Sequence, residues 1–151
     1  MTDPKIAIKA LLISEWDDDN TSSVTPTFST GWYDAKSKRP QVTLTDPSEV
    51  PQSKGPAPFL GIATNGAPTQ LFVCSLACNV WATRDAIDIN PKKCVYELKE
   101  EIRRILLSKY ADVTDLDYVA WLGGNEVVDD TVIPPVFRFI GEIGYAYLKT
   151  S

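Results

Sequence analysis

The chain has 151 residues, 20 of them acidic and 15 basic, which gives a formal net charge of −5 at pH 7. This acidic balance argues against a basic face that grips nucleic acid. The sequence contains no histidine, which excludes Ser-His-Asp and Cys-His sites and removes the commonest general base. The length favours one domain, and no apolar run approaches the roughly 20 residues that span a bilayer.

The first predicted element is a helix that begins after Asp3, with Pro4 in its first turn. Its apolar residues cover more than half of its circumference, so we expect packing on two sides, partly by another subunit. It lacks a basic leader and a cleavage pattern, which favours a helix over a signal peptide. The acidic run 17–19 follows. It could hold Ca²⁺ or Mg²⁺, but it lacks the spacing of a calcium loop, and a solvated helix exit is preferred.

An aromatic island comes next, in a segment rich in Thr, Ser and Gly. We expect a short strand at 27–33, a basic turn at 36–39, and a half-exposed strand at 41–45, where apolar and polar residues alternate. Trp32 and Tyr33 lie beside the basic turn. They either form an aromatic and cationic docking surface or pack down at the end of a strand, and both interpretations stay open.

Residues 46–58 contain four prolines, which argue against a helix or a central strand. We therefore predict a long flexible loop here. Loops of this length are usually functional or disordered. Its candidate partner contacts are Glu49, Val50 and Lys54.

A hairpin is predicted from two strands, 59–64 and 69–82, that turn at Asn65 and Gly66. The second strand is apolar on both faces, which is typical of a central strand with cover on both sides. Cys74 and Cys78 lie on it, too far apart for a disulfide. With Cys94 they are expected to be buried, reduced thiols, which suggests a reducing compartment during folding.

The clearest element is a helix at 91–110, capped by Asn90, with apolar residues at three- and four-residue steps. Lys92 and Lys93 oppose the helix dipole in its first turn. They either contact an anion or are simply solvated, and the second interpretation is preferred. A short strand at 117–122, a turn at 123–125 and a closing strand at 136–148 complete the chain. Phe137 and Tyr145 share one face of the closing strand.

Helices separated by consecutive strands indicate a single α+β domain over residues 1–151, with a mainly antiparallel sheet flanked by two principal helices. Phosphate-binding loops and nucleophile elbows are absent from the sequence, and we assign no catalytic, cofactor-binding or metal-binding residue. A metal-dependent nuclease would use Glu97 and Lys99 with Asp85 and Asp88. Two residues apart on a helix, Glu97 and Lys99 point about 200° away from each other, which disfavours that site.

Three stretches carry a family resemblance: 30–34 (TGWYD), 40–45 (PQVTLT), and the block from 81–84 (WATR) into the helix at 97–105. Together with the element order, they resemble the small neck and tail-completion proteins of tailed phages and tailed archaeal viruses, above all the tail-terminator type. The resemblance implies an α+β fold with a sheet flanked by helices. It also implies a ring, typically of six copies, that caps the tail tube, joins it to the head and has no catalytic residues.

The implied partners are further copies of the chain, the tail tube protein and the neck or connector proteins, with DNA passing through without specific binding. The implied location is the virion tail or neck, after assembly in the host cytoplasm, with no membrane. Loop 46–58 would face the tube or channel, and the first helix and closing strand would contact neighbours. The candidate interface residues are Trp32, Tyr33, Glu49, Val50, Lys54, Phe137 and Tyr145. A non-ring adaptor or assembly chaperone is the alternative, followed by the nuclease.

Overall fold

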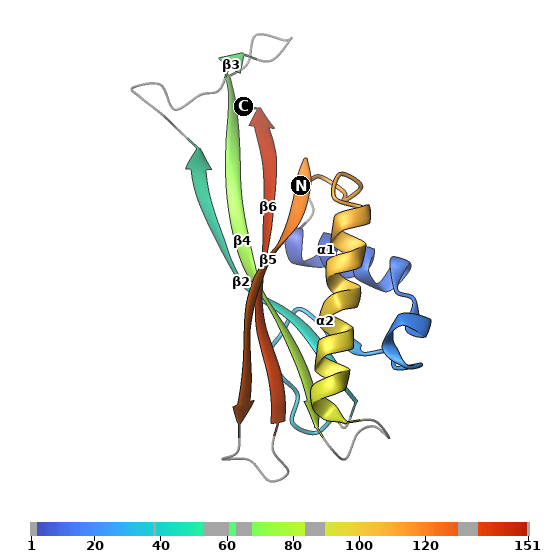
Figure 1. The fold of residues 1–151 in the computed structure, drawn as a ribbon. Helices are drawn as coiled ribbons and strands as arrows, with labels where there is room; N and C mark the ends of the chain where they lie inside the picture. Colours follow the sequence, from blue (N-terminus) through green and yellow to red (C-terminus); the bar gives the residue numbers. More distant parts are fainter. Residues whose placement is uncertain are drawn as a thin grey trace.

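Six strands form one sheet in the computed structural model of the protein, and two α-helices lie on one side of it (Figure 1). The structure describes residues 3–37, 39–52, 61–62, 68–83, 90–129 and 136–150. The elements are α1 (Pro4–Glu15), η1 (Asp18–Thr21), β1 (Thr27–Ser29), β2 (Gln41–Gln52), β3 (Gly61–Ile62), β4 (Pro68–Thr83), α2 (Pro91–Ser108), β5 (Tyr118–Asp129) and β6 (Val136–Thr150).

The strand order is β1-β2-β4-β6-β5, with the short β3 paired to β4. Only β1 and β2 run parallel; every other pairing in the described part of the chain is antiparallel. The two longest strands, β4 and β6, lie at the centre and pair without interruption. The predicted α+β fold with a mainly antiparallel sheet and two helices is therefore confirmed.

Helix α2 lies along the sheet because one of its sides is continuously apolar. Asn90 caps it by accepting a hydrogen bond from the Lys92 amide at 2.9 Å, and Pro91 opens the first turn, as predicted. Its core-facing residues are Cys94, Val95, Leu98, Ile102, Ile105 and Leu106. These pack against the alternate residues Cys74, Leu76, Cys78 and Val80 of β4, which makes one continuous core.

Helix α1 begins after the predicted cap, where Asp3 accepts a hydrogen bond from the Lys5 amide. Ala7, Ile8 and Leu12 are buried in the core, while Ile6 and Ile13 are about half exposed. Only part of the apolar circumference is therefore covered within a single chain.

The predicted loop at 46–58 is wrong over its first half, because β2 continues to Gln52. The pairing with β4 shifts between Thr45 and Ser48, so two residues, one of them Pro47, lie opposite one residue of β4 in a bulge. Beyond this point β4 is the only strand beside β2 among the described residues, which makes that stretch an edge. Bulges and edges are the two places where a sheet tolerates proline. Residues 53–58 lie outside the described residues.

The predicted turn at 123–125 is also wrong, because β5 runs through it from Tyr118 to Asp129. A register shift between Trp121 and Gly123 absorbs the turn-like sequence as a bulge. Gly123 adopts φ +89°, which a side chain would strain, and a Cβ on Gly124 would lie 1.9 Å from the Ile140 carbonyl oxygen. The glycines thus let β5 continue along β6.

The remaining predictions concern the first strand, a turn and the cysteines. The strand expected at 27–33 is limited to β1, Thr27–Ser29. The turn expected at Asn65 and Gly66 lies outside the described residues. All three cysteines are buried, as expected, and none of them forms a disulfide. Within the described residues, no helix combines the length and apolar character needed to traverse a membrane.

Candidate functional site

The strongest candidate site is a group of aromatic and cationic side chains on the face of the sheet opposite α2. Val80 of β4 joins the core beneath α2, so its neighbour Trp81 points to the other face. There, Trp81 meets Trp32, Tyr33 and Arg138. We call these four residues the Trp–Arg cluster.

The cluster has a buried base and an exposed rim. Tyr33 stacks on Trp81 with 4.6 Å between ring centres, and Trp32 meets Trp81 edge-on at 5.8 Å. The Arg138 guanidinium lies 4.2 Å from the centre of the Trp81 ring and 5.1 Å from that of Trp32. Trp81 is 7 % exposed, whereas Trp32 is 59 % exposed. Tyr33 therefore packs down, as one interpretation expected, while Trp32 stays available for contact, as the other expected.

Hydrogen bonds from Gln41 fix the segment that carries Trp32 and Tyr33. Gln41 is buried, and its side-chain oxygen accepts from the Asp34 amide at 2.9 Å. Its side-chain nitrogen donates to the Asp34 carbonyl at 2.8 Å. The Asp34 carboxylate in turn accepts from the Lys36 amide, which closes a tight turn. The two aromatic rings are thus held in place by a buried amide at the start of β2.

Arg138 contributes a positive charge that no carboxylate in the described part of the chain neutralises. Its Nε and Nη2 donate to Asn79 Oδ1 at 3.2 and 2.8 Å. Burial lowers the pKa of Arg138, but a guanidinium with so high an ordinary pKa remains protonated at neutral pH. Asn79 is 1 % exposed, and its Nδ2 is buried without a hydrogen-bond partner among the described residues. Arg138 and Asn79 therefore both carry N–H groups without a described hydrogen-bond partner, and Arg138 lies next to the exposed Trp32 ring.

A second surface feature is the outer edge of β5, whose only strand neighbour among the described residues is β6. The strand exposes four large apolar side chains: Tyr118, Leu122, Val127 and Val128. A long edge strand with exposed apolar residues is a ready template for pairing with another chain. By contrast β6, expected to contact neighbours, lies between β4 and β5, so among the described residues it has no free edge for strand pairing.

The remaining predicted interface residues are scattered. Glu49 and Val50 lie on β2 at the register positions of Cys74 and Val73, and Lys54 lies outside the described residues. Phe137 is half-buried against the core. Tyr145 is completely buried, because the odd-numbered residues of β6 face α2, so its assignment to a surface contact is wrong.

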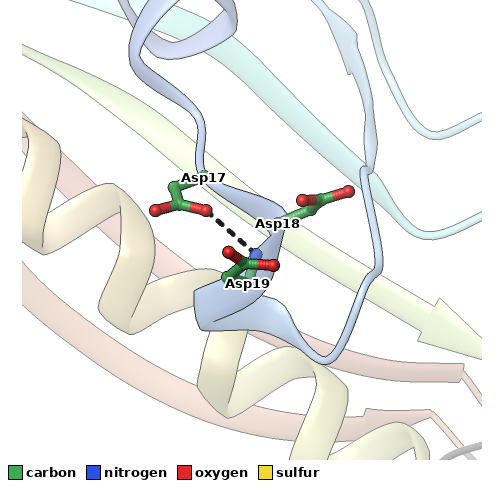
Figure 2. Close-up of side chains that lie close together, drawn as sticks. All are labelled: Asp17, Asp18 and Asp19. Carbon is green, nitrogen blue, oxygen red and sulfur yellow. Dashed lines mark hydrogen bonds between the residues drawn. The ribbon is translucent and has the colours of Figure 1, made fainter.

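The acidic run forms an exposed turn at the entrance of η1. One carboxylate oxygen from each of Asp17, Asp18 and Asp19 lies within 4.8 Å of the others (Figure 2). Asp17 accepts a hydrogen bond from the Asp19 amide at 3.0 Å, which caps η1. This arrangement matches the solvated helix exit that was preferred for this run.

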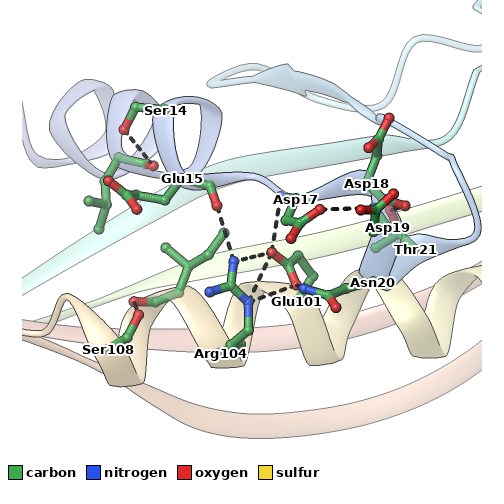
Figure 3. Close-up of polar contacts among 12 residues, drawn as sticks. Ser14, Glu15, Asp17, Asp18, Asp19, Asn20, Thr21, Glu101, Arg104 and Ser108 are labelled. Atoms are coloured by element: carbon green, nitrogen blue, oxygen red, sulfur yellow. Dashed lines mark hydrogen bonds and ion pairs between the residues drawn. The ribbon is translucent and has the colours of Figure 1, made fainter.

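Below this turn, a buried carboxylate ties η1 to α2 (Figure 3). Glu101 accepts hydrogen bonds from the Asp17 amide at 3.2 Å and the Asn20 side chain at 2.9 Å, and forms an ion pair with Arg104. Arg104 also donates to the Glu15 carbonyl at the end of α1. Glu101 therefore fixes the acidic turn to the helical side of the molecule.

Glu97 and Lys99, the described residues of the nuclease hypothesis, contact different partners. Glu97 accepts a hydrogen bond from the Ser22 hydroxyl at 2.8 Å and pairs with Lys93 at 3.7 Å. Lys99 points elsewhere: its Nζ lies 4.6 Å from the centre of the Tyr96 ring and 3.1 Å from Glu100. Asp85 and Asp88 lie outside the described residues. Lys92 and Lys93 are both exposed, which agrees with the preferred interpretation of two solvated lysines.

Sequence reasoning found Trp32 and Tyr33 but missed Trp81, Asn79 and Arg138. The β4–β6 register, which places Trp81 opposite Arg138, brings these distant residues together. The sequence does indicate the position of Trp81, because side chains alternate along β4 and place Trp81 on the face opposite Val80. Comparison with protein-family models and with curated proteins finds no match to this chain.

Proposed function

We propose that the protein is a structural virion component that assembles into a closed ring, as a tail terminator or neck protein. In this role it caps the tail tube, joins it to the head and catalyses no reaction. The proposal starts from the resemblance in residues 30–34, 40–45 and 81–105. Its partners are further copies of the chain, the tube protein and the adjoining neck proteins.

The observation that carries the proposal is the open edge of β5. Val127 and Val128 are 41 % and 48 % exposed at consecutive positions, so both faces of the strand present apolar surface. Charges and prolines, which usually protect such edges, are sparse here: β5 contains two acidic residues and no Lys, Arg or Pro. Strand pairing with a neighbouring subunit would cover this edge.

Two further features fit a ring around DNA. On α1, Ile6 and Ile13 are half exposed on the side that the chain leaves open, which suits a second subunit contact. The net charge of −5 suits a channel through which DNA slides without adhering, because negative walls repel phosphate.

Light scattering coupled to size-exclusion chromatography, with negative-stain imaging, tests the proposal directly. We expect a closed ring, formed by the chain alone or on addition of the tube protein. A protein that stays monomeric at high concentration with tube protein present contradicts it. A monomer that binds tube protein one to one would support the adaptor alternative instead. Metal-dependent DNA cleavage that Glu97→Ala abolishes would establish the nuclease.

A further inference from the structure

The Trp–Arg cluster lies within a basic region of an acidic protein. Arg138 has five N–H groups, of which the bonds to Asn79 use two. Lys36 and Arg39 are exposed on the segment that carries Trp32, and no ion pair with a described carboxylate involves either of them. Arg138 thus lies beside an exposed indole, and the segment that carries this indole bears Lys36 and Arg39 against one carboxylate, Asp34. A guanidinium and an aromatic ring with further cations nearby are the chemistry that binds a carboxylate-bearing surface.

The complementary charge is present on the same chain, on the other side of the sheet. Asp17, Asp18 and Asp19 form the exposed turn that Glu101 ties to α2, so the turn belongs to the helical side (Figure 3). Arg138 and Trp32 lie on the opposite face. One copy cannot bring the two together, because the sheet separates them.

We propose that the Trp–Arg cluster of one copy, with Lys36 and Arg39, binds the acidic turn at Asp17–Asp19 of the next copy. This inference rests on the proposed ring. Because the two contacting surfaces differ, the contact is head to tail, and such contacts close into rings when the rotation between copies allows it.

The chemistry of the cluster suits this occupant. The planar guanidinium of Arg138 contacts two indole rings and is fixed by Asn79, and its fork of N–H groups favours a carboxylate over a spherical anion. On the turn, three close carboxylates repel one another, and cations from a neighbour relieve that repulsion.

Charge reversal tests the contact with variants that leave the fold intact. The basic variant set is Lys36→Glu with Arg39→Glu, and the acidic set is Asp18→Lys with Asp19→Lys. All four side chains are exposed. Asp17 and Arg138 are retained, because Asp17 caps η1 and Arg138 packs on Trp81. Each double variant should need about tenfold more protein for half-assembly, or fail to assemble.

Mixing provides the decisive control. An equimolar mixture of the two double variants, and a single chain with all four reversals, should both regain assembly, because each restores opposite charges across the contact. Added salt should weaken wild-type assembly for the same reason. Circular dichroism and thermal unfolding of each variant check that its monomer folds like the wild type.

Four results would overturn the inference. If the wild type forms rings and both double variants form them equally well, the contact lies elsewhere while the proposed ring stands. If the double variants fail but neither restored combination assembles, opposite charges are not what joins the copies. If the wild type never assembles, the ring and the contact both fail. Duplex DNA that protects Trp32 from fluorescence quenching, lost in the Lys36→Glu/Arg39→Glu variant, would identify a nucleic-acid surface instead.

Discussion

Glu101 shows how a single charged residue can connect two elements, α2 and η1. It is 2 % exposed, yet it accepts hydrogen bonds from η1 and forms an ion pair with Arg104 on its own helix. Burial is the largest influence on the pKa of Glu101 and raises it. The hydrogen bonds from Arg104, Asn20 and the Asp17 amide, with the Arg104 charge, outweigh burial and hold the pKa below its usual value. The ionised form therefore stabilises the fold.

Replacing Glu101 with Gln should lower the free energy of unfolding at pH 7 by about 2 kcal/mol, because a neutral amide cannot satisfy the same charged donors. The stabilisation is complete above the pKa of an unfolded glutamate, about 4.3, and is lost as the pH falls through the lower folded pKa. Urea unfolding of both proteins should therefore converge in acid. Glu100→Gln, at a partly exposed ion pair, should cost less than about 1 kcal/mol. An undiminished difference at pH 3 would contradict this account.

The cysteines give a second test at the residue scale. Burial raises the pKa of the Cys78 thiol to about 12, and burial with the nearby Glu97 charge does the same for Cys94. At pH 8 about one thiol in ten thousand is then ionised, so a thiol reagent should react only as the protein unfolds. Ellman's reagent should give a slow signal in buffer and three thiols in strong denaturant. Rapid release from the native protein would show that the core opens readily.

At the scale of elements, two predictions were wrong because each segment contains a β-bulge that continues a strand. The proline run after Thr45 predicts a loop, but the bulge and the edge position let β2 continue to Gln52. Likewise Gly123 and Gly124 predict a turn, yet they carry β5 past a bulge. Helix α2 was predictable because its caps and its apolar stripe are local signals. Bulges depend on the partner strand, and a single sequence does not contain that pairing.

Gly124→Ala tests the close approach of β5 to β6. A Cβ at this position would lie 1.9 Å from the Ile140 carbonyl oxygen and 2.7 Å from Gly141 Cα, so the two strands must separate. Thermal and urea unfolding should show a loss of about 1–3 kcal/mol. Gly31→Ala is the matched control, because its Cβ meets only the Ser29 hydroxyl at 3.5 Å and should change stability little. Equal effects at both glycines would show that general backbone entropy, rather than the strand contact, matters.

The candidate site was predictable only in part, for a reason that belongs to the same scale. Trp32 and Tyr33 are neighbours in sequence beside a basic turn, so they suggested a surface without any fold. Arg138 reaches them only through the β4–β6 pairing, and Tyr145 was misplaced because the face covered by α2 is decided by packing. Local chemistry was thus visible in the sequence, and long-range placement was not.

The whole molecule is one-sided, because both helices lie on one side of the sheet (Figure 1). The strand register places the Trp–Arg cluster on the other side. Its two charged surfaces therefore face different ways, and β5 leaves an apolar edge at one end of the strand order. A molecule with unlike surfaces on different sides is suited to heterologous contacts between copies. Substitutions on these surfaces should therefore change assembly rather than the stability of the subunit.

Val127→Lys with Val128→Lys should abolish ring formation without unfolding the subunit. Both side chains are already 41 % and 48 % exposed, so the monomer should keep its melting temperature within about 2 °C. Lysines on an edge strand oppose pairing, because a second strand would have to bury their charges. The control is Leu107→Lys with Tyr110→Lys, which alters two exposed residues at the far end of α2. Light scattering should show monomers for the β5 variant and rings for the control. The reverse result would place the subunit contact on the helical side and leave the β5 edge without a role in assembly.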